Sequence, residues 1–278
     1  MGCTKLDPKI DPPAYLEITD YDVITDPQTQ GTNNQKFTDV LVSTSTHNYG
    51  YYPIPCKIPI PADGSTYLSI RPGILVNGVK FLRVDYPPMR GCDTTLPLKK
   101  GQGLKFTPTF KYFSTTTFPL IEDFEGGIGF KLKNSNPTDT FCTRIDGTNA
   151  IYGSKCLSMR LGGGYTVCQL QSSYGFPLPA DGRSTYLEFN YKSNFPIEVG
   201  VIGADNPGGL PPGQLDQRSA GGANASAGWN KLYVDLTNLI ATPPYHNDYF
   251  LYIYTATTFN PSVASPQIYI DNVKIVVQ

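Results

Sequence analysis

Apolar and polar residues alternate along most of this chain with a period of two, in short runs separated by turns rich in glycine and proline. The runs from Tyr15 to Val23 and from Lys231 to Leu236 are typical examples. Because successive side chains of a strand point to opposite faces, this period predicts β-strands that bury one face. The 27 glycines and 25 prolines among 278 residues disfavour long helices. We therefore predict an all-β protein with almost no helix.

The spacing of these runs divides the chain into two parts. Short strands with closely spaced turns over residues 14–115 predict a small immunoglobulin-like sandwich. The segment Thr115–Pro119 is typical of an extended linker. Longer strands and loops over residues 120–278 predict a jelly roll. The expected fold is thus two consecutive β-sandwiches, preceded by a short tether over residues 1–13.

Charged residues are balanced in this chain. It has 22 Lys and Arg residues against 23 Asp and Glu residues, which gives a net charge of -1. Neither half carries the basic excess that binding to a phosphate backbone requires, so we predict that nucleic acid is not a partner. No run approaches the ~18 consecutive apolar residues of a membrane-spanning helix. Membrane association is therefore expected only through a lipid anchor.

Cys3 precedes a leader, Thr4–Pro13, that is rich in Pro and Asp and has no hydrophobic pattern. This arrangement resembles a bacterial lipoprotein after removal of its signal peptide, with the lipidated cysteine first and a tether next. Myristoylation of Gly2 is not indicated, because that motif requires Ser or Thr where Leu6 stands. The alternative is an ordinary N-terminal thiol. A lipid at Cys3 predicts an exported lipoprotein of the outer membrane or cell surface.

The other five cysteines are divided between the two halves of the chain. In an exported protein a disulfide within each half is expected, and strand alternation favours the pairs Cys142–Cys156 and Cys56–Cys92, with Cys168 unpaired. The alternative is that these cysteines are buried thiols. Neither a C-x-x-C pair nor a nearby His indicates zinc.

Three motifs of the C-terminal half occur in the order and spacing of a known family: Ile121–Gly127, Gly228–Leu236 and Ile268–Ile275. They resemble the first, late and last strands of jelly rolls of the carbohydrate-binding-module, galactose-binding-like type. The resemblance covers about Leu120 to Gln278. It implies a domain that binds glycan without catalysis.

Motifs of the N-terminal half resemble small immunoglobulin-like or PEGA-like sandwiches: Thr38–Val42, Tyr52–Pro55 and Ile70–Gly78. Such domains occur on surface lipoproteins of Gram-negative bacteria. This resemblance agrees with an anchor at Cys3 and implies no activity.

In jelly rolls of this family the first and last strands often hold a structural calcium ion. The resemblance places this site at Asp123, Glu125 and Asp271. Carboxylates suit calcium, which takes 6–8 oxygen ligands. The alternative is that Glu125 and Asp271 accept hydrogen bonds from local backbone amides.

The same family binds sugars on exposed aromatic rings, with nearby polar groups that bind the hydroxyls. The alternative for these rings is packing in the core or across strands. The candidate residues, which lie on strands or at strand ends, are Tyr165, Tyr174, Phe176 and Tyr191, with Arg160 and Gln169 as hydrogen-bonding partners.

No catalytic constellation is recognisable, so we predict that the protein is not an enzyme. Glu188 and Glu198 lie on neighbouring expected strands, where two carboxylates of a glycosidase would stand, but Glu188 is interpreted as an ordinary outward residue. Two functions remain open. One is a surface lipoprotein that binds glycan, and the other is a structural or protein-binding component of a cell-surface assembly.

Overall fold

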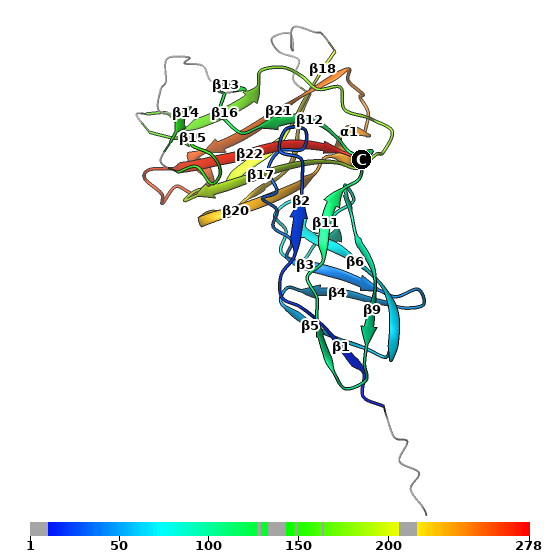
Figure 1. The fold of residues 1–278 in the computed structure, drawn as a ribbon. Coiled ribbons are helices and arrows are strands. Elements are labelled where there is room, and N and C mark those ends of the chain that lie inside the picture. The colour runs from blue at the N-terminus through cyan, green and yellow to red at the C-terminus, as the bar shows by residue number, and fades with distance from the viewer. Residues whose placement is uncertain (1–10, 127–128, 133–142, 148, 163, 206–215) are drawn as a thin grey trace, which may run out of the picture. The chain divides into compact units, whose positions relative to one another are not determined.

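The computed structural model describes residues 11–126, 129–132, 143–147, 149–162, 164–205 and 216–278. Within these residues the regular structure is β-strand except for one α-helix, α1 (Thr237–Ile240), and one 3-10 turn, η1 (Thr257–Phe259) (Figure 1). The prediction of an all-β protein is confirmed. The chain forms two compact units.

The first unit is built from the described residues of Met1–Ile24 together with Phe37–Gly73 and Met89–Lys111. One of its sheets has the order β10-β1-β5, a second has the order β2-β11-β8, and in a third β3, β4, β6 and β9 pair antiparallel. Burial alternates along β1, as the period of two predicts. The strands that lie wholly or mainly in this unit are β1 (Ala14–Ile18), β2 (Asp22–Ile24), β3 (Asp39–Ser43), β4 (Asn48–Pro53), β5 (Cys56–Ile60), β6 (Gly64–Leu75), β8 (Met89–Arg90), β9 (Cys92–Leu98), β10 (Gly103–Lys105) and β11 (Thr109–Tyr112).

The second unit is a sandwich of two sheets. The six-stranded sheet has the order β14-β15-β22-β17-β20, with β12 also paired to β22, and the five-stranded sheet has the order β13-β16-β21-β18-β19. These two layers form the expected jelly roll. The strands of these two sheets are β12 (Thr117–Glu122), β13 (Phe130–Leu132), β14 (Thr143–Asp146), β15 (Cys156–Arg160), β16 (Val167–Ser172), β17 (Thr185–Ser193), β18 (Ile197–Ala204), β19 (Asp216–Ala223), β20 (Ser226–Asp235), β21 (Asp248–Ala256) and β22 (Gln267–Val277). The unit also includes β7 (Arg83–Asp85), which belongs to neither sheet.

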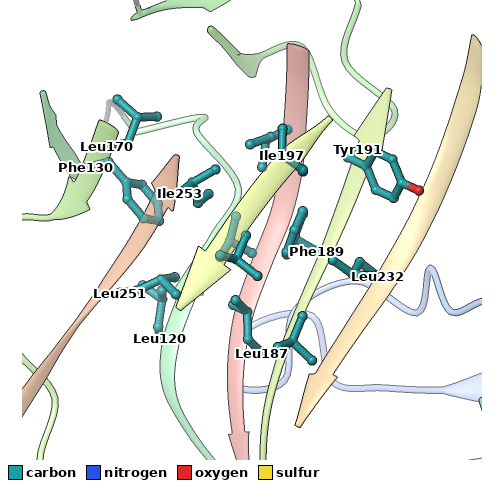
Figure 2. Packing of buried hydrophobic residues seen from close by; sticks show 14 of the residues in the cluster. Leu120, Phe130, Leu170, Leu187, Phe189, Tyr191, Ile197, Leu232, Leu251 and Ile253 are labelled. Carbon is teal, nitrogen blue, oxygen red and sulfur yellow. The ribbon is translucent and has the colours of Figure 1, made fainter. Parts of the chain in front are cut away.

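The hydrophobic core of the second unit lies between its two sheets. Figure 2 shows Leu187 and Phe189 of β17 in one cluster with Leu251 and Ile253 of β21. On β21 the residues between them, such as Tyr252, point away from this core and belong to a separate apolar cluster. Burying one leucine or isoleucine side chain contributes about 1.5–3 kcal/mol, so this core dominates the stability of the unit.

Two segments from the N-terminal half of the sequence belong to the second unit. They are Thr25–Lys36 and Ile74–Pro88, and they are called the covering segments below. The backbone N–H of Lys36 donates to the Tyr233 hydroxyl at 2.9 Å, and the N–H of Asn77 donates to the Tyr233 carbonyl at 2.8 Å. The second unit is therefore not continuous in sequence, whereas the sequence pattern placed both segments in the first sandwich.

The cysteines differ from the expected pairing. Cys168 is disulfide-bonded, whereas Cys56, Cys92 and Cys156 are thiols. The predicted Cys56–Cys92 bond is wrong, since both residues are thiols, Cys56 on β5 and Cys92 on β9. The prediction of an unpaired Cys168 is also wrong, as is the Cys142–Cys156 bond. Strand alternation assigns a cysteine to a face but does not select its partner.

Candidate functional site

The outer face of the six-stranded sheet, turned away from the core, carries a buried carboxylate. Glu188 on β17 is fully buried, and its Oε2 lies 3.0 Å from the Lys231 ammonium. The Tyr112 hydroxyl donates to Oε1 at 2.8 Å, and the Gln35 amide donates to Oε2 at 2.9 Å. The Tyr86 hydroxyl also donates to Oε1. Three hydrogen-bond donors and the Lys231 ammonium thus hold the Glu188 carboxylate. Glu188 is therefore not the ordinary outward residue that the sequence indicated.

A second lysine completes this cluster. The Lys274 ammonium is buried and donates to the carbonyl of Thr32 in a covering segment at 2.7 Å. Burial lowers the pKa of Lys274, as does the charge of Lys231, whereas Glu188 opposes the shift. Burial raises the pKa of Glu188, but the charges of Lys231 and Lys274, together with the hydrogen bonds from Tyr86 and Gln35, hold that pKa below its usual value. The cluster therefore joins the covering segments to the sheet through charge.

This cluster is structural. Glu188 has no exposed surface and hence cannot meet a ligand. Glu188 and Glu198 also lie in different sheets, on β17 and β18. The glycosidase-like pair considered from the sequence is therefore not formed.

The outer face of the five-stranded sheet has a different character. The side-chain amide of Gln169 on β16 donates to the side-chain Oε1 of Gln217 on β19 at 3.3 Å, although β21 and β18 lie between their strands. Below them the Tyr252 hydroxyl donates to Glu198 at 2.8 Å. Burial, and next the hydrogen bond to Glu198, raise the pKa of Tyr252. The side chains of Gln169 and Gln217 thus span this face, and Tyr252 beside them is fixed by its hydrogen bond to Glu198.

Apolar and aromatic side chains support these amides. Gln169 pairs in register with Tyr254, and Gln171 pairs with Tyr252. The rings of Tyr254 and Phe259 meet edge to face with their centroids 5.6 Å apart. A small cluster of Ile202, Ala204, Phe250 and Tyr252 fills the sheet surface beneath. The name glutamine face denotes Gln169, Gln171, Gln217, Tyr252 and Tyr254.

The structure does not bring the six sequence-derived sugar candidates together. Phe176 and Tyr191 lie in the hydrophobic core, with exposed fractions of 2% and 5%, and offer no ring face to a ligand. Figure 2 shows the Tyr191 ring packed in this cluster. Tyr174 is 55% exposed and packs edge to face on Phe176. Alternation along β17 would have indicated the inward orientation of Tyr191.

The other three candidates lie in separate places. Tyr165 is half-buried in the turn between β15 and β16. Arg160 ends β15 on the six-stranded sheet, and Gln169 lies on the glutamine face. Sequence reasoning missed Gln217 and Tyr254. Gln217 precedes the small-residue stretch Ser219–Gly228, which predicts a loop and not the observed β19. Tyr254 lies on an expected strand, but the sequence does not tell which sheet that strand joins.

The expected calcium carboxylates are engaged with the backbone. Asp271 accepts hydrogen bonds from the N–H groups of Asn272 at 2.8 Å and Ile151 at 3.1 Å. Glu125 accepts from the N–H groups of Ser154 and Lys155, both at 2.7 Å. This arrangement corresponds to the alternative considered from the sequence.

Asp271 nevertheless has an unusual charge environment. Burial raises its pKa to about 6, although backbone donors oppose the shift, and the charge of Glu125 raises it further. Asp123 is exposed and accepts from the Glu125 N–H at 3.1 Å. Among the described residues, no group of three or more His, Cys, Asp or Glu side chains is arranged to hold a metal ion. Calcium at Asp123, Glu125 and Asp271 stays a prediction.

Cys3 lies outside the described residues, so the anchor also stays a prediction. A search of the described residues finds no helix with the length and apolar character to cross a membrane.

Comparisons with known proteins find structural likeness only. No family model matches the chain, and no curated protein matches it. A family 29 carbohydrate-binding module is 14% identical, with a TM-score of 0.35 over 59% of this chain and 92% of its own. The C-terminal family 22 module of Clostridium thermocellum Xyn10B is 15% identical, with a TM-score of 0.36 over 58% and 94%. A family 61 module solved with beta-1,4-galactotriose is 12% identical, with a TM-score of 0.35 over 56% and 94%. The assignment of the jelly roll rests on the strand order and the core.

Proposed function

We propose that this protein is a non-catalytic glycan-binding protein and that its glutamine face receives the sugar. The observation that carries the proposal is the pair Gln169–Gln217, which spans the outer face of the five-stranded sheet above Tyr252. Amide groups both donate and accept hydrogen bonds, which suits sugar hydroxyls. A ligand that replaces the Gln169–Gln217 contact would find both amides already positioned.

The aromatic pair beside these amides supplies an apolar contact. Tyr254 is half-buried and Phe259 is 38% exposed, so their rings are accessible from the same side as Gln169. Sugar rings have apolar faces that pack on aromatic rings, while neighbouring polar groups select the hydroxyls. The outer face of the six-stranded sheet offers no equivalent near Glu188, because the covering segments bury it.

The experiment is a glycan array with the soluble Cys3→Ser protein, followed by calorimetry with the best ligand. Gln169→Ala and Tyr254→Ala should each weaken binding by at least about tenfold, or about 1.4 kcal/mol. Gln102→Ala, an exposed glutamine of the first unit, is the matched control and should bind as the unaltered protein does. Silence of the whole array, or binding that survives both substitutions, would reject the glutamine face.

A protein-binding role is the second candidate, and one hairpin favours it. Phe81 is 88% exposed, and Val79 and Leu82 beside it are 47% and 46% exposed. Neighbouring exposed apolar side chains are typical of interaction sites. Capture of a surface protein that is lost in Phe81→Ser, with a silent glycan array, would favour this function.

We also propose that Cys3 carries the lipid that anchors the protein at the outer cell surface. The Pro- and Asp-rich leader after Cys3 supports this, since it suits a tether. Cys3→Ser in the full-length gene should move the protein from the membrane fraction to the soluble fraction. An unchanged fractionation would remove the anchor from the proposal.

A further inference from the structure

In the six-stranded sheet, β15, β22 and β17 run side by side (Figure 1). Residues of these strands and of the loops beside them line two neighbouring cavities. Each has a volume of about 280 Å³, and Gln267 lines both. Lys192, Asn194 and Tyr269 contribute to the first cavity, and Arg160 contributes to the second. No residue of the covering segments lines either one. This end of the sheet is therefore open, in contrast to the end around Glu188.

Arg160 is held in place with donors to spare. With the Gln267 amide turned so that Oε1 faces Arg160, this oxygen accepts from Nε at 3.2 Å and from Nη2 at 2.9 Å, and also from the Tyr269 hydroxyl. A guanidinium has five N–H donors, more than Gln267 engages through Nε and Nη2. Gln267 thus orients the guanidinium without neutralising its charge.

Lys192 supplies a second cation across the same strand. It pairs in register with Tyr269, while Arg160 pairs with Gln267, on opposite sides of β22. The Lys192 ammonium lies 5.8 Å from the centroid of the Tyr269 ring, a cation–π distance. The Lys192 ammonium donates to the neutral Asn149 side chain at 3.5 Å.

Within the described residues, Arg160 and Lys192 have no carboxylate partner. None of the residues that line the two cavities is an Asp or a Glu. An anionic ligand would supply the missing negative charge through charge-assisted hydrogen bonds.

We propose that these paired cavities bind an acidic sugar, a hexuronate, with its carboxylate on Arg160 and Lys192. The polar wall of Asn194 and Gln267 provides partners for hydroxyls. The volume of each cavity is near the lower end of small-molecule sites, ~300–1,000 Å³, which suits one or two sugar rings. This site lies on the other sheet from the glutamine face and does not depend on the function proposed for that face.

The test compares an oligogalacturonate with its methyl ester, using the Cys3→Ser protein and calorimetry at low and high salt. The two ligands share their rings and hydroxyls and differ in charge. The acid should bind at least about tenfold more tightly than the ester. Its binding should weaken as salt is added, because salt ions screen the attraction between the ligand carboxylate and the cations of Arg160 and Lys192. Sodium acetate at equal carboxylate concentration should not compete, which distinguishes a sugar site from a general carboxylate site.

Variants of Arg160 and Lys192 test whether the preference for the acid arises at this site. Arg160→Gln and Lys192→Gln should each reduce binding of the acid by at least about tenfold and leave binding of the ester unchanged. Arg183→Gln, at an exposed arginine that pairs with Asp181, is the matched control. Gln169→Ala should leave oligogalacturonate binding unchanged, so failure of the glutamine face is separable from failure here. Equal binding of acid and ester, no measurable binding of the acid, or retained binding in both variants would overturn the proposal.

Discussion

The outer face of each sheet in the second unit carries a glutamate that accepts hydrogen bonds from tyrosine, but one face is covered by the chain and the other is open. On the six-stranded sheet, Glu188 accepts hydrogen bonds from two tyrosines beneath segments of the chain itself. On the five-stranded sheet, Glu198 accepts from Tyr252 on a face that carries accessible glutamines. A sheet face becomes structural or available for ligand according to what the rest of the chain places on it. Four predictions test this comparison, from the largest expected effect to the smallest.

Glu188→Gln should destabilise the second unit by about 3–5 kcal/mol, because it leaves two buried lysines without a counter-charge. Glu198→Gln is the matched change on the other sheet and should cost only about 1 kcal/mol, since Tyr252 keeps an acceptor. Chemical denaturation followed by tyrosine fluorescence measures both. Equal losses would show that the covered face is no more structural than the open one.

If calcium binds at Asp123, Glu125 and Asp271, chelation should destabilise the second unit. An ion that binds only the folded state contributes about 4 kcal/mol at a thousand times its dissociation constant. EDTA should then lower the melting temperature, and Asp271→Asn should abolish the sensitivity. An identical melt with EDTA and with added calcium would leave the carboxylates as acceptors of backbone amides only.

Without metal, Asp271 should make stability depend on pH. Its pKa is raised from 3.8 to about 6 in the folded protein, so the folded state holds this proton more tightly. The stability it contributes is present below pH 3.8 and is lost as the pH rises through 6. Denaturation in EDTA between pH 4 and 7 should show this loss, and Asp271→Asn should remove it. The exposed Asp123→Asn serves as control and should retain the slope.

Gly31→Ala should destabilise more than Gly182→Ala. Both glycines have positive φ, +68° and +84°, so a side chain strains the backbone at either position by about 1–2 kcal/mol. A Cβ at Gly31 would lie 2.8 Å from Cε of Lys274, whereas nothing lies within 4 Å at Gly182. Crowding at the covering segment should add about 1–3 kcal/mol to the loss for Gly31→Ala. Melting curves of the two proteins compare them directly, and equal shifts would mean that the covering segment adapts freely.

Much of the local structure could be read from the sequence, but the site could not. The period of two correctly predicted β1, because one-sided burial leaves that imprint on a strand. β21 was also predicted as a strand, although both of its faces are buried. Gln169 was identified as a candidate, yet its contact with Gln217 crosses two intervening strands. No spacing in the sequence encodes that contact, since sheet order is decided by how distant strands pack.

The sequence by itself determined the all-β class, the turns and the alternation that makes one face of each strand apolar. Only the tertiary structure decided that Phe176 and Tyr191 lie in the core, that Cys168 forms a disulfide, and that Glu188 is buried. The physical reason is the same in each case. Alternation tells which residues share a side of a strand, whereas burial and charge pairing depend on the segment that covers that side. For Glu188 that segment includes Gln35, which donates to its carboxylate from 153 positions earlier in the chain.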